Sequence, residues 1–113
     1  MGKRCNIRRF GNAFAPLDEA LSRAVIDISS RPFCSVNLNL KRDCIGTISS
    51  EMLEHVFESF AVAARITLHV EVLSGKNDHH KAEAAFKACG IALRAAIVED
   101  KTAGIPSTKD VLA

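Results

Sequence analysis

The segment His79 to Glu83, which reads HHKAE, places three metal-binding side chains within five residues of one another. On a helix, Glu83 shares a face with His79 at a spacing of four residues or with His80 at a spacing of three. The side chains of adjacent histidines diverge by roughly 100° around a helix. One metal ion rarely takes both, so a pair of metals, one on each imidazole, fits the spacing better. The alternative is a helix start that merely carries polar residues.

Groups suited to a phosphate accompany this segment. His80, Glu83 and Lys87 follow the i, i+3, i+7 spacing of one helix face. A cation one turn beyond a metal-binding carboxylate suits a substrate with a phosphate near its reacting centre, although Lys87 also fits a plain surface lysine. Further cations and hydroxyls of the right chemistry occur at Arg9, Arg31, Ser107 and Lys109. Together these residues predict phosphate binding at one end of a site and metal-assisted chemistry at the other.

Taken from the residue pattern alone, two other histidines fit structural roles better than metal binding. His55 lies at the edge of an apolar helical stripe, where a partly buried, hydrogen-bonded histidine is the ordinary case. His69 alternates with Leu68 and Val70 in a strand-like run and is more typical of a structural polar residue than of a ligand.

Size and composition restrict the class of protein. The 113 residues suffice for one small domain, spanning 1–113, and 48% hydrophobic residues predict a globular core. A net charge of +2 is too small to indicate nucleic-acid binding. No run approaches the roughly 20 apolar residues of a membrane span, and no signal-like apolar segment follows the first basic residues. The four cysteines match no zinc module, so free thiols and a cytoplasmic location are expected.

The elements that must position these residues form an α+β layer. Residues 10–17 suit an edge strand or an extended loop, and residues 34–40 alternate as a half-buried strand. Residues 17–28 are ambiguous, and their apolar period slightly favours a helix. Residues 66–73 predict a buried strand, and residues 43–48 a loop.

Two helices complete the pattern. One is capped by Ser49 or Ser50, and the other by Asp78. The apolar stripe of the first comprises Met52, Leu53, Val56, Phe57, Phe60, Ala61 and Ala64. The stripe of the second comprises Ala82, Ala85, Phe86, Cys89, Leu93, Ala96 and Ile97. The order of strands and helices predicts a small sheet with two helices on one face.

Four blocks resemble the C-terminal half of imidazoleglycerol-phosphate dehydratase. They are Arg9-Phe10-Gly11 with Pro16 to Leu21, Ser30-Arg31-Pro32, Glu51 to His55, and Asn77 to Ala88; Pro106 to Lys109 closes the match. The resemblance implies a β-β-β-α-β-α half-domain with a small mixed sheet, a fold class also found in ribosomal proteins. It also implies that Ala20 to Ile28 is a strand, against the helical period.

The resemblance further implies a site with two manganese ions that is completed by ligands from a second, similar half. The matching metal ligands are His55, His79, His80 and Glu83. The matching phosphate ligands are Arg9, Arg31, Lys87, Ser107 and Lys109, and Asp18 matches an acidic residue near the substrate. The implied reaction converts imidazole glycerol phosphate into imidazole acetol phosphate by loss of water.

The matched blocks account for one half of the family's chain, so the resemblance implies that the other ligands lie outside this sequence. Asp110 stands where the family usually has glycine after Lys109. The family forms a 24-subunit shell with sites at subunit contacts, and two copies of this chain could pair to imitate a complete unit. A non-catalytic metal-binding or assembly module is the alternative function, and a nucleic-acid binder is a weaker third.

Overall fold

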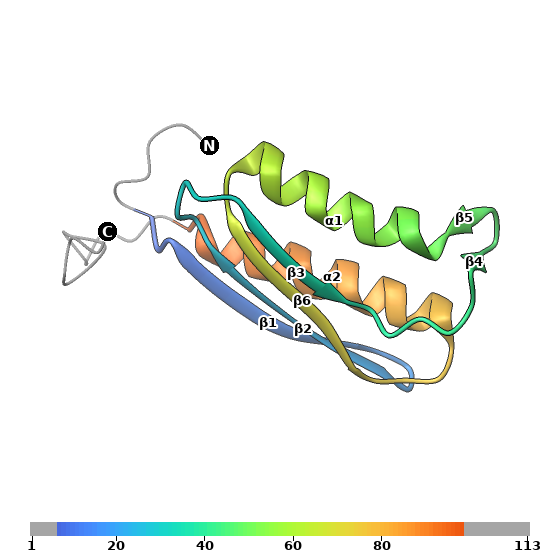
Figure 1. Ribbon diagram of the computed structural model, residues 1–113. Helices are drawn as coiled ribbons and strands as arrows, with labels where there is room; N and C mark the ends of the chain where they lie inside the picture. The colour runs from blue at the N-terminus through green and yellow to red at the C-terminus, as the bar shows by residue number, and fades with distance from the viewer. Residues whose placement is uncertain (1–6, 99–113) are drawn as a thin grey trace.

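A four-stranded mixed sheet carries two helices on one face in the computed structural model, which describes residues 7–98 (Figure 1). The sheet has the order β1-β2-β6-β3, with β1 at Phe10–Leu17, β2 at Ala20–Asp27, β6 at Thr67–Ser74 and β3 at Phe33–Asn37. β2 pairs antiparallel with β1 and with β6, whereas β3 runs parallel to β6. This arrangement confirms the predicted α+β class, with two helices on one face of a mixed sheet.

β1 and β2 form the hairpin that carries Asp18 and Glu19 in its turn. Pairing runs without interruption from Phe10 opposite Asp27 to Leu17 opposite Ala20. Side chains of β1 alternate, with Ala13 and Ala15 buried under α2 (Asp78–Ala96) and their neighbours exposed. Of the two alternatives predicted for residues 10–17, an edge strand or an extended loop, the structure has the edge strand.

The helical period at residues 17–28 predicted the wrong element. In β2, Ala24 and Ile26 are buried while Val25 between them is 38% exposed, which is the two-residue alternation of a strand. β2 lies between β1 and β6 and has backbone partners on both edges. Pairing on both sides decides the conformation here, since the local pattern was compatible with either element. The strand implied by the family resemblance is correct.

The segment after β3 is more structured than predicted. β3 ends at Asn37 rather than at residue 40, because Asn39 takes a left-handed backbone conformation with φ of 54°. Leu38 nevertheless stays fully buried on the inward side, as the alternation predicted. The expected loop at residues 43–48 contains a small hairpin of β4 (Cys44–Ile45) and β5 (Ile48–Ser49) that turns at Gly46.

Helix α1 (Ser50–Ala64) begins as the sequence predicted. Ser49 is the N-cap, and its hydroxyl oxygen accepts a hydrogen bond from the backbone N–H of Met52 at 3.0 Å. Leu53, Phe57 and Ala61 are buried, whereas Met52 is 52% exposed at the margin of the stripe. Val56 is also exposed. The buried face is therefore narrower than the predicted one.

Helix α2 (Asp78–Ala96) is capped by Asn77 and not by Asp78. The side-chain oxygen of Asn77 accepts from the backbone N–H of His80 at 3.0 Å. Asp78 is the first helical residue, and its buried carboxylate accepts from the backbone N–H groups of Lys41 and Arg42. Asp78 thus binds the segment that follows β3 to the start of α2.

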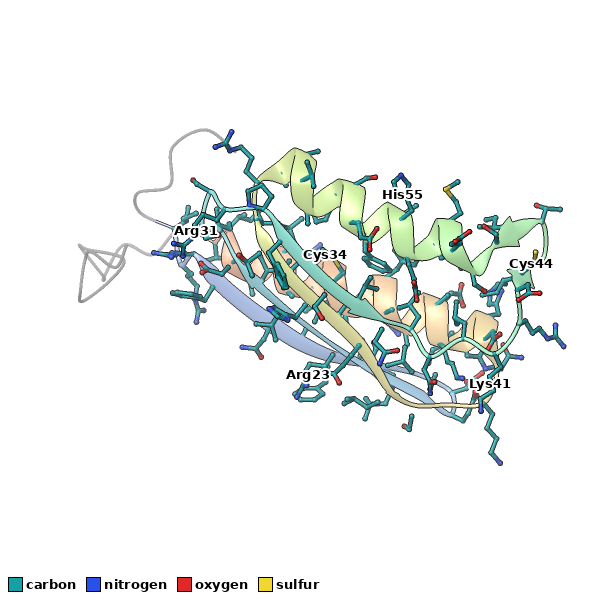
Figure 2. All side chains as sticks on the ribbon, in the orientation of Figure 1. Arg23, Arg31, Cys34, Lys41, Cys44 and His55 are labelled. Atoms are coloured by element: carbon teal, nitrogen blue, oxygen red, sulfur yellow. The ribbon has the colours of Figure 1, made fainter. Side chains whose placement is uncertain are left out.

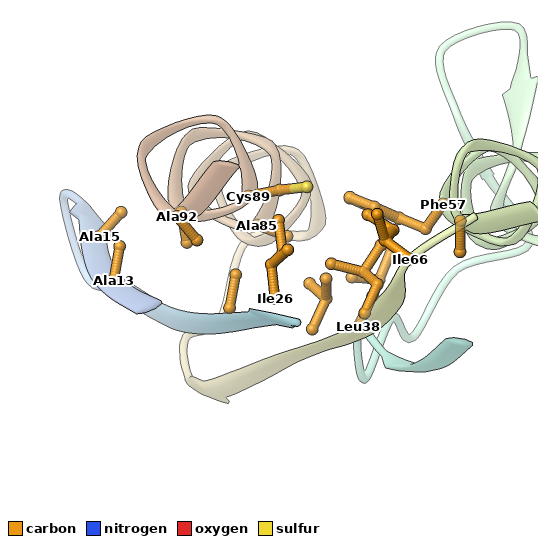
Figure 3. Packing of buried hydrophobic residues seen from close by; sticks show 14 of the residues in the cluster. Ala13, Ala15, Ile26, Leu38, Phe57, Ile66, Ala85, Cys89 and Ala92 are labelled. Carbon is orange, nitrogen blue, oxygen red and sulfur yellow. The ribbon is translucent and has the colours of Figure 1, made fainter. Parts of the chain in front are cut away.

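Small side chains let α2 lie close against the sheet (Figure 3). Ala85, Ala88 and Ala92 are fully buried in the core, whereas the predicted stripe residues Phe86 and Ile97 are 40% and 45% exposed. Gly11 marks the closest approach, because a Cβ placed there would lie 2.0 Å from the carbonyl oxygen of Ala92. The expectation of free thiols holds for the cysteines within residues 7–98, namely Cys34, Cys44 and Cys89.

Candidate metal and phosphate site

The first turns of α2 present His79 and Glu83 together toward solvent. Nε2 of His79 lies 3.4 Å from Oε1 of Glu83, one helical turn away, and both side chains are more than half exposed. Two ligands about 2.1 Å from one metal ion are separated by roughly 3.0 to 3.5 Å at bond angles of about 90–110°. The observed spacing therefore fits two ligands of a shared divalent cation.

His80 points away from His79 toward the β1–β2 turn. The two rings are nearly perpendicular, with an interplanar angle of 84° and centroids 6.4 Å apart. Nδ1 of His80 lies 2.8 Å from Oε1 of Glu19, and its Nε2 lies 3.6 Å from Oδ2 of Asp18. The divergence that helix geometry predicted for the adjacent histidines is confirmed, and each imidazole has its own acidic neighbourhood.

The carboxylate of Glu19 is held by hydrogen bonds. Backbone N–H groups of Asn77 and Lys76 donate to it, and together with His80 they lower the pKa of Glu19 from 4.5 to about 2. The hydrogen bond to Glu19 in turn raises the pKa of His80, helped by the charges of Glu19, Asp18 and Glu83 and opposed by partial burial. Glu19 therefore remains an anion throughout the neutral range.

These donors suit a divalent cation in type and spacing. Imidazole nitrogens and a carboxylate oxygen are the ligands that manganese, zinc and iron take in proteins. Among residues 7–98, however, no group of three or more His, Cys, Asp or Glu side chains converges to hold a metal. The described part of the chain thus offers partial ligand sets that further donors would have to complete.

His55 lies on α1 and points away from the sheet (Figure 2). Its side chain is exposed, and its Nε2 lies 3.2 Å from the hydroxyl of Ser59 within the same helix. It lines a shallow surface hollow together with acidic residues, Glu51, Glu54 and Glu58. The structure therefore does not bring His55 together with His79, His80 and Glu83 within one chain.

Lys87 extends from α2 toward the same turn as His80. Its ammonium group donates to the carbonyl oxygen of Pro16 at 3.1 Å, and the side chain remains exposed. The spacing of His80 and Lys87 along the helix therefore places both beside the β1–β2 turn, as the i, i+7 pattern predicted. Lys87 is close to the candidate metal ligands and available to an anion.

Arg9 and Arg31 lie at the opposite end of the sheet. Arg9 precedes β1 and forms an ion pair with Asp27, with Nε 2.7 Å from Oδ1. Arg31 is exposed in the turn between β2 and β3, and Figure 2 places it at the far end from Lys41, which lies beside the start of α2. A strand of the length of β1 separates Arg9 from Pro16 by roughly 23 Å. The predicted phosphate ligands therefore fall into two groups, and Ser107 and Lys109 lie outside the described residues.

A basic hollow of about 410 Å³ lies beside His79. It is lined by residues that precede α1 and residues at the start of α2, namely Lys41, Arg42, Ile45, Gly46, Lys76, Asn77, Asp78 and His79. Its three cations give it the charge to attract an anion.

The sequence analysis assigned no role to two residues that the structure shows in close polar contacts, Lys81 and Glu19. Lys81 is fully buried, donates to the carbonyl oxygen of Asn39 at 2.8 Å and lies 3.7 Å from Asp78. Glu19 contacts His80 across 61 positions of sequence. The signal available for Lys81 was its place four residues before Ala85 and seven before Ala88 on the buried face of α2, whereas nothing local pointed to Glu19.

Comparison with known proteins identifies the family. A family model described as imidazoleglycerol-phosphate dehydratase matches residues 1–93. The chain belongs to the imidazoleglycerol-phosphate dehydratase family. A family member from Phytophthora nicotianae is 62% identical over all 113 residues, and one from Saccharomyces cerevisiae is 58% identical over 94% of this chain.

Solved structures of imidazoleglycerol-phosphate dehydratases share the fold. The Pyrococcus furiosus enzyme superposes with a TM-score of 0.82 at 42% identity over 96% of this chain. The Staphylococcus aureus enzyme gives a TM-score of 0.81 at 38% identity over 86% of this chain. This chain spans a quarter of the Phytophthora relative, 48% of the yeast relative and 60% of the Pyrococcus structure. Residues 7–98 contain no helix that is both long and apolar enough to cross a membrane.

Proposed function

We propose that this chain supplies half of an active site that dehydrates imidazole glycerol phosphate to imidazole acetol phosphate in cytoplasmic histidine biosynthesis. Family membership over the whole chain supports the reaction. The structural observation that best supports metal-assisted chemistry is the distance between His79 and Glu83. Nε2 of His79 lies 3.4 Å from Oε1 of Glu83 at the exposed start of α2.

The metal ligands on this chain are His55, His79, His80 and Glu83, and a complete site takes two manganese ions. The divergent rings of His79 and His80 support one histidine for each ion, because their centroids are 6.4 Å apart and nearly perpendicular. A second half or a second copy supplies the remaining ligands. This division agrees with the partial ligand sets of the described residues.

In the reaction a proton leaves carbon and a hydroxyl group leaves as water. Bound manganese supplies Lewis-acid stabilisation to the negative charge that builds up on the imidazole ring of the substrate. Glu19 holds His80 through its Nδ1, and Asp18 lies 3.6 Å from Nε2 of the same ring. Asp18 would contact a substrate bound beside His80. Lys87 neutralises part of the phosphate charge one turn beyond Glu83.

The phosphate ligands support an assembly in which copies share sites. Arg9 and Arg31 are separated from Lys87 by roughly the length of β1, about 23 Å, which is much more than the span of one phosphate. The two arginines of one copy therefore serve a phosphate held near His80 and Lys87 of another copy. Ser107 and Lys109 complete the phosphate site, and the assembly is the family's 24-subunit shell.

The alternative is a catalytically incomplete metal-binding or assembly fragment. It is favoured by one observation, that no group of three or more metal-binding side chains converges within residues 7–98. Such a fragment would keep His79, His80 and Glu83 for metal binding and lack turnover.

Manganese binding and substrate turnover separate the two functions. The dehydratase predicts manganese-dependent formation of imidazole acetol phosphate, and His80→Ala should abolish it while weakening metal uptake. Manganese binding without turnover, both for this chain alone and after addition of the family's other half as a separate polypeptide, would favour the fragment.

A further inference from the structure

The turn between β1 and β2 is joined to the start of α2 by one carboxylate. Oε2 of Glu19 accepts hydrogen bonds from the backbone N–H groups of Lys76 at 2.9 Å and Asn77 at 2.8 Å. The other oxygen, Oε1, lies 2.8 Å from Nδ1 of His80. The two oxygens of Glu19 thus have different partners. Oε2 binds the backbone that precedes α2, and Oε1 binds the ring of His80.

The contact with Glu19 determines which nitrogen of His80 carries the proton. An ionised carboxylate has only acceptor sites, so the 2.8 Å contact requires a hydrogen on Nδ1 of His80. In the neutral ring the lone pair is then on Nε2, which faces the open side near Asp18. Carboxylates in this relation to a histidine commonly set the tautomer and ring orientation of a metal ligand.

We propose that Glu19 is a positioning residue that fixes His80 in the Nδ1–H tautomer and so aims its Nε2 lone pair at the metal. This inference rests on the proposed function for the identity of the metal, while the tautomer is a property of the chain itself. Glu19 acts through His80 and does not itself touch the substrate.

Because the two oxygens have different partners, Glu19→Gln should change the contact with His80 and keep the contacts with the backbone. One amide oxygen can take the place of Oε2 and accept both backbone N–H groups, so the anchor of α2 is retained. The amide NH₂ then replaces Oε1 and donates to Nδ1, which becomes an acceptor. The proton of the neutral ring moves to Nε2, and that nitrogen loses the lone pair a metal requires.

The test combines ¹⁵N NMR of the imidazole with manganese titration. Spectra of the metal-free chain, recorded at a pH where His80 is neutral, should show the Nδ1–H tautomer in the wild type and the Nε2–H tautomer in Glu19→Gln. Manganese affinity, measured by calorimetry, should fall about 10- to 100-fold in this variant. Glu71→Gln removes a carboxylate that pairs with Arg23 on the exposed face of the sheet, and should change neither quantity.

An unchanged tautomer in Glu19→Gln would overturn the inference, whatever the metal affinity does. A changed tautomer with unchanged manganese affinity would also overturn it, because His80 would then not bind metal through Nε2. If the wild-type chain binds no manganese at all, the metal part of the proposed function fails, and the tautomer alone decides the role of Glu19.

Discussion

Nε2 of His79 and Oε1 of Glu83 lie 3.4 Å apart across one turn of α2, at the separation of two ligands on a common metal ion. Both side chains are exposed, so a metal could bind without displacing protein atoms. The helix itself determines this spacing, and the backbone at its start is fixed by the Asn77 cap. The ligand pair is therefore preorganised by secondary structure.

Removing either member of this pair should weaken manganese binding. We expect His79→Ala and Glu83→Gln each to lower manganese affinity by about 100-fold, beyond the effect of most outer-shell substitutions. Calorimetric titration measures the change. His69→Ala, which alters an exposed ring that packs against Phe33 on the other face of the sheet, should leave affinity unchanged. Equal losses in all three variants would point to unfolding and contradict a specific site.

Alanine substitutions at two glycines should change the stability of the chain in opposite directions. Gly11→Ala forces β1 and α2 apart, because the new Cβ would lie 2.0 Å from the Ala92 carbonyl oxygen, and should cost about 2–3 kcal/mol. Gly90→Ala adds a methyl group on α2 with nothing within 4 Å and should stabilise the helix by about 0.5–1 kcal/mol. Urea unfolding of the isolated chain measures both. A Gly11→Ala variant as stable as the wild type would contradict the described contact between β1 and α2.

The buried pair of Lys81 and Asp78 should behave as one unit. Lys81→Met removes the charge and the hydrogen bond to Asn39, leaves Asp78 buried without its cation, and should cost about 3 kcal/mol. The double variant with Asp78→Asn should lose less than the sum of the single variants, because no uncompensated charge remains. A double-variant cycle in urea checks this. Strict additivity would show that the two side chains do not interact.

The contact between Glu19 and His80 predicts a limited pH range of extra stability. The pKa of Glu19 falls from 4.5 to about 2, so its contribution is complete above about pH 4.5 and is lost as pH falls toward 2. The pKa of His80 is raised above 6.5, so its contribution is complete below about pH 6.5 and is lost as pH rises through the raised value. The stability difference between wild type and Glu19→Gln should therefore be largest between about pH 4.5 and 6.5. Urea midpoints at a series of pH values measure it, and a difference independent of pH would contradict the ion pair.

The elements with strong local patterns were predictable from the sequence. The Ser49 cap, the strand at β6 and the alternation through Leu38 all follow from short-range chemistry. β2 was not predictable by period alone, because the apolar residues of segment 17–28 fit both elements and slightly favour a helix. Pairing with two neighbouring strands resolves it, and pairing partners lie far away in the sequence.

The site shows the same division between local and distant contacts. The HHxxE spacing predicted that Glu83 would share a face with either His79 or His80, and in α2 it lies beside His79. Glu19 could not be found this way, since a hairpin turn meets α2 only after the sheet has formed. Asp78 looked like a cap because aspartate suits that position, but Asn77 took the role when the Asp78 carboxylate bound the backbone at Lys41 and Arg42.

Turnover of imidazole glycerol phosphate tests the central claim most directly. This chain would be mixed with a separate polypeptide comprising the N-terminal half of the Saccharomyces cerevisiae relative, with manganese in excess, and product would be followed by mass spectrometry. The account predicts conversion of the substrate with loss of one water, abolished by His80→Ala in this chain. Absence of that product, although both polypeptides are folded and bind manganese, would contradict the proposed dehydratase half-site.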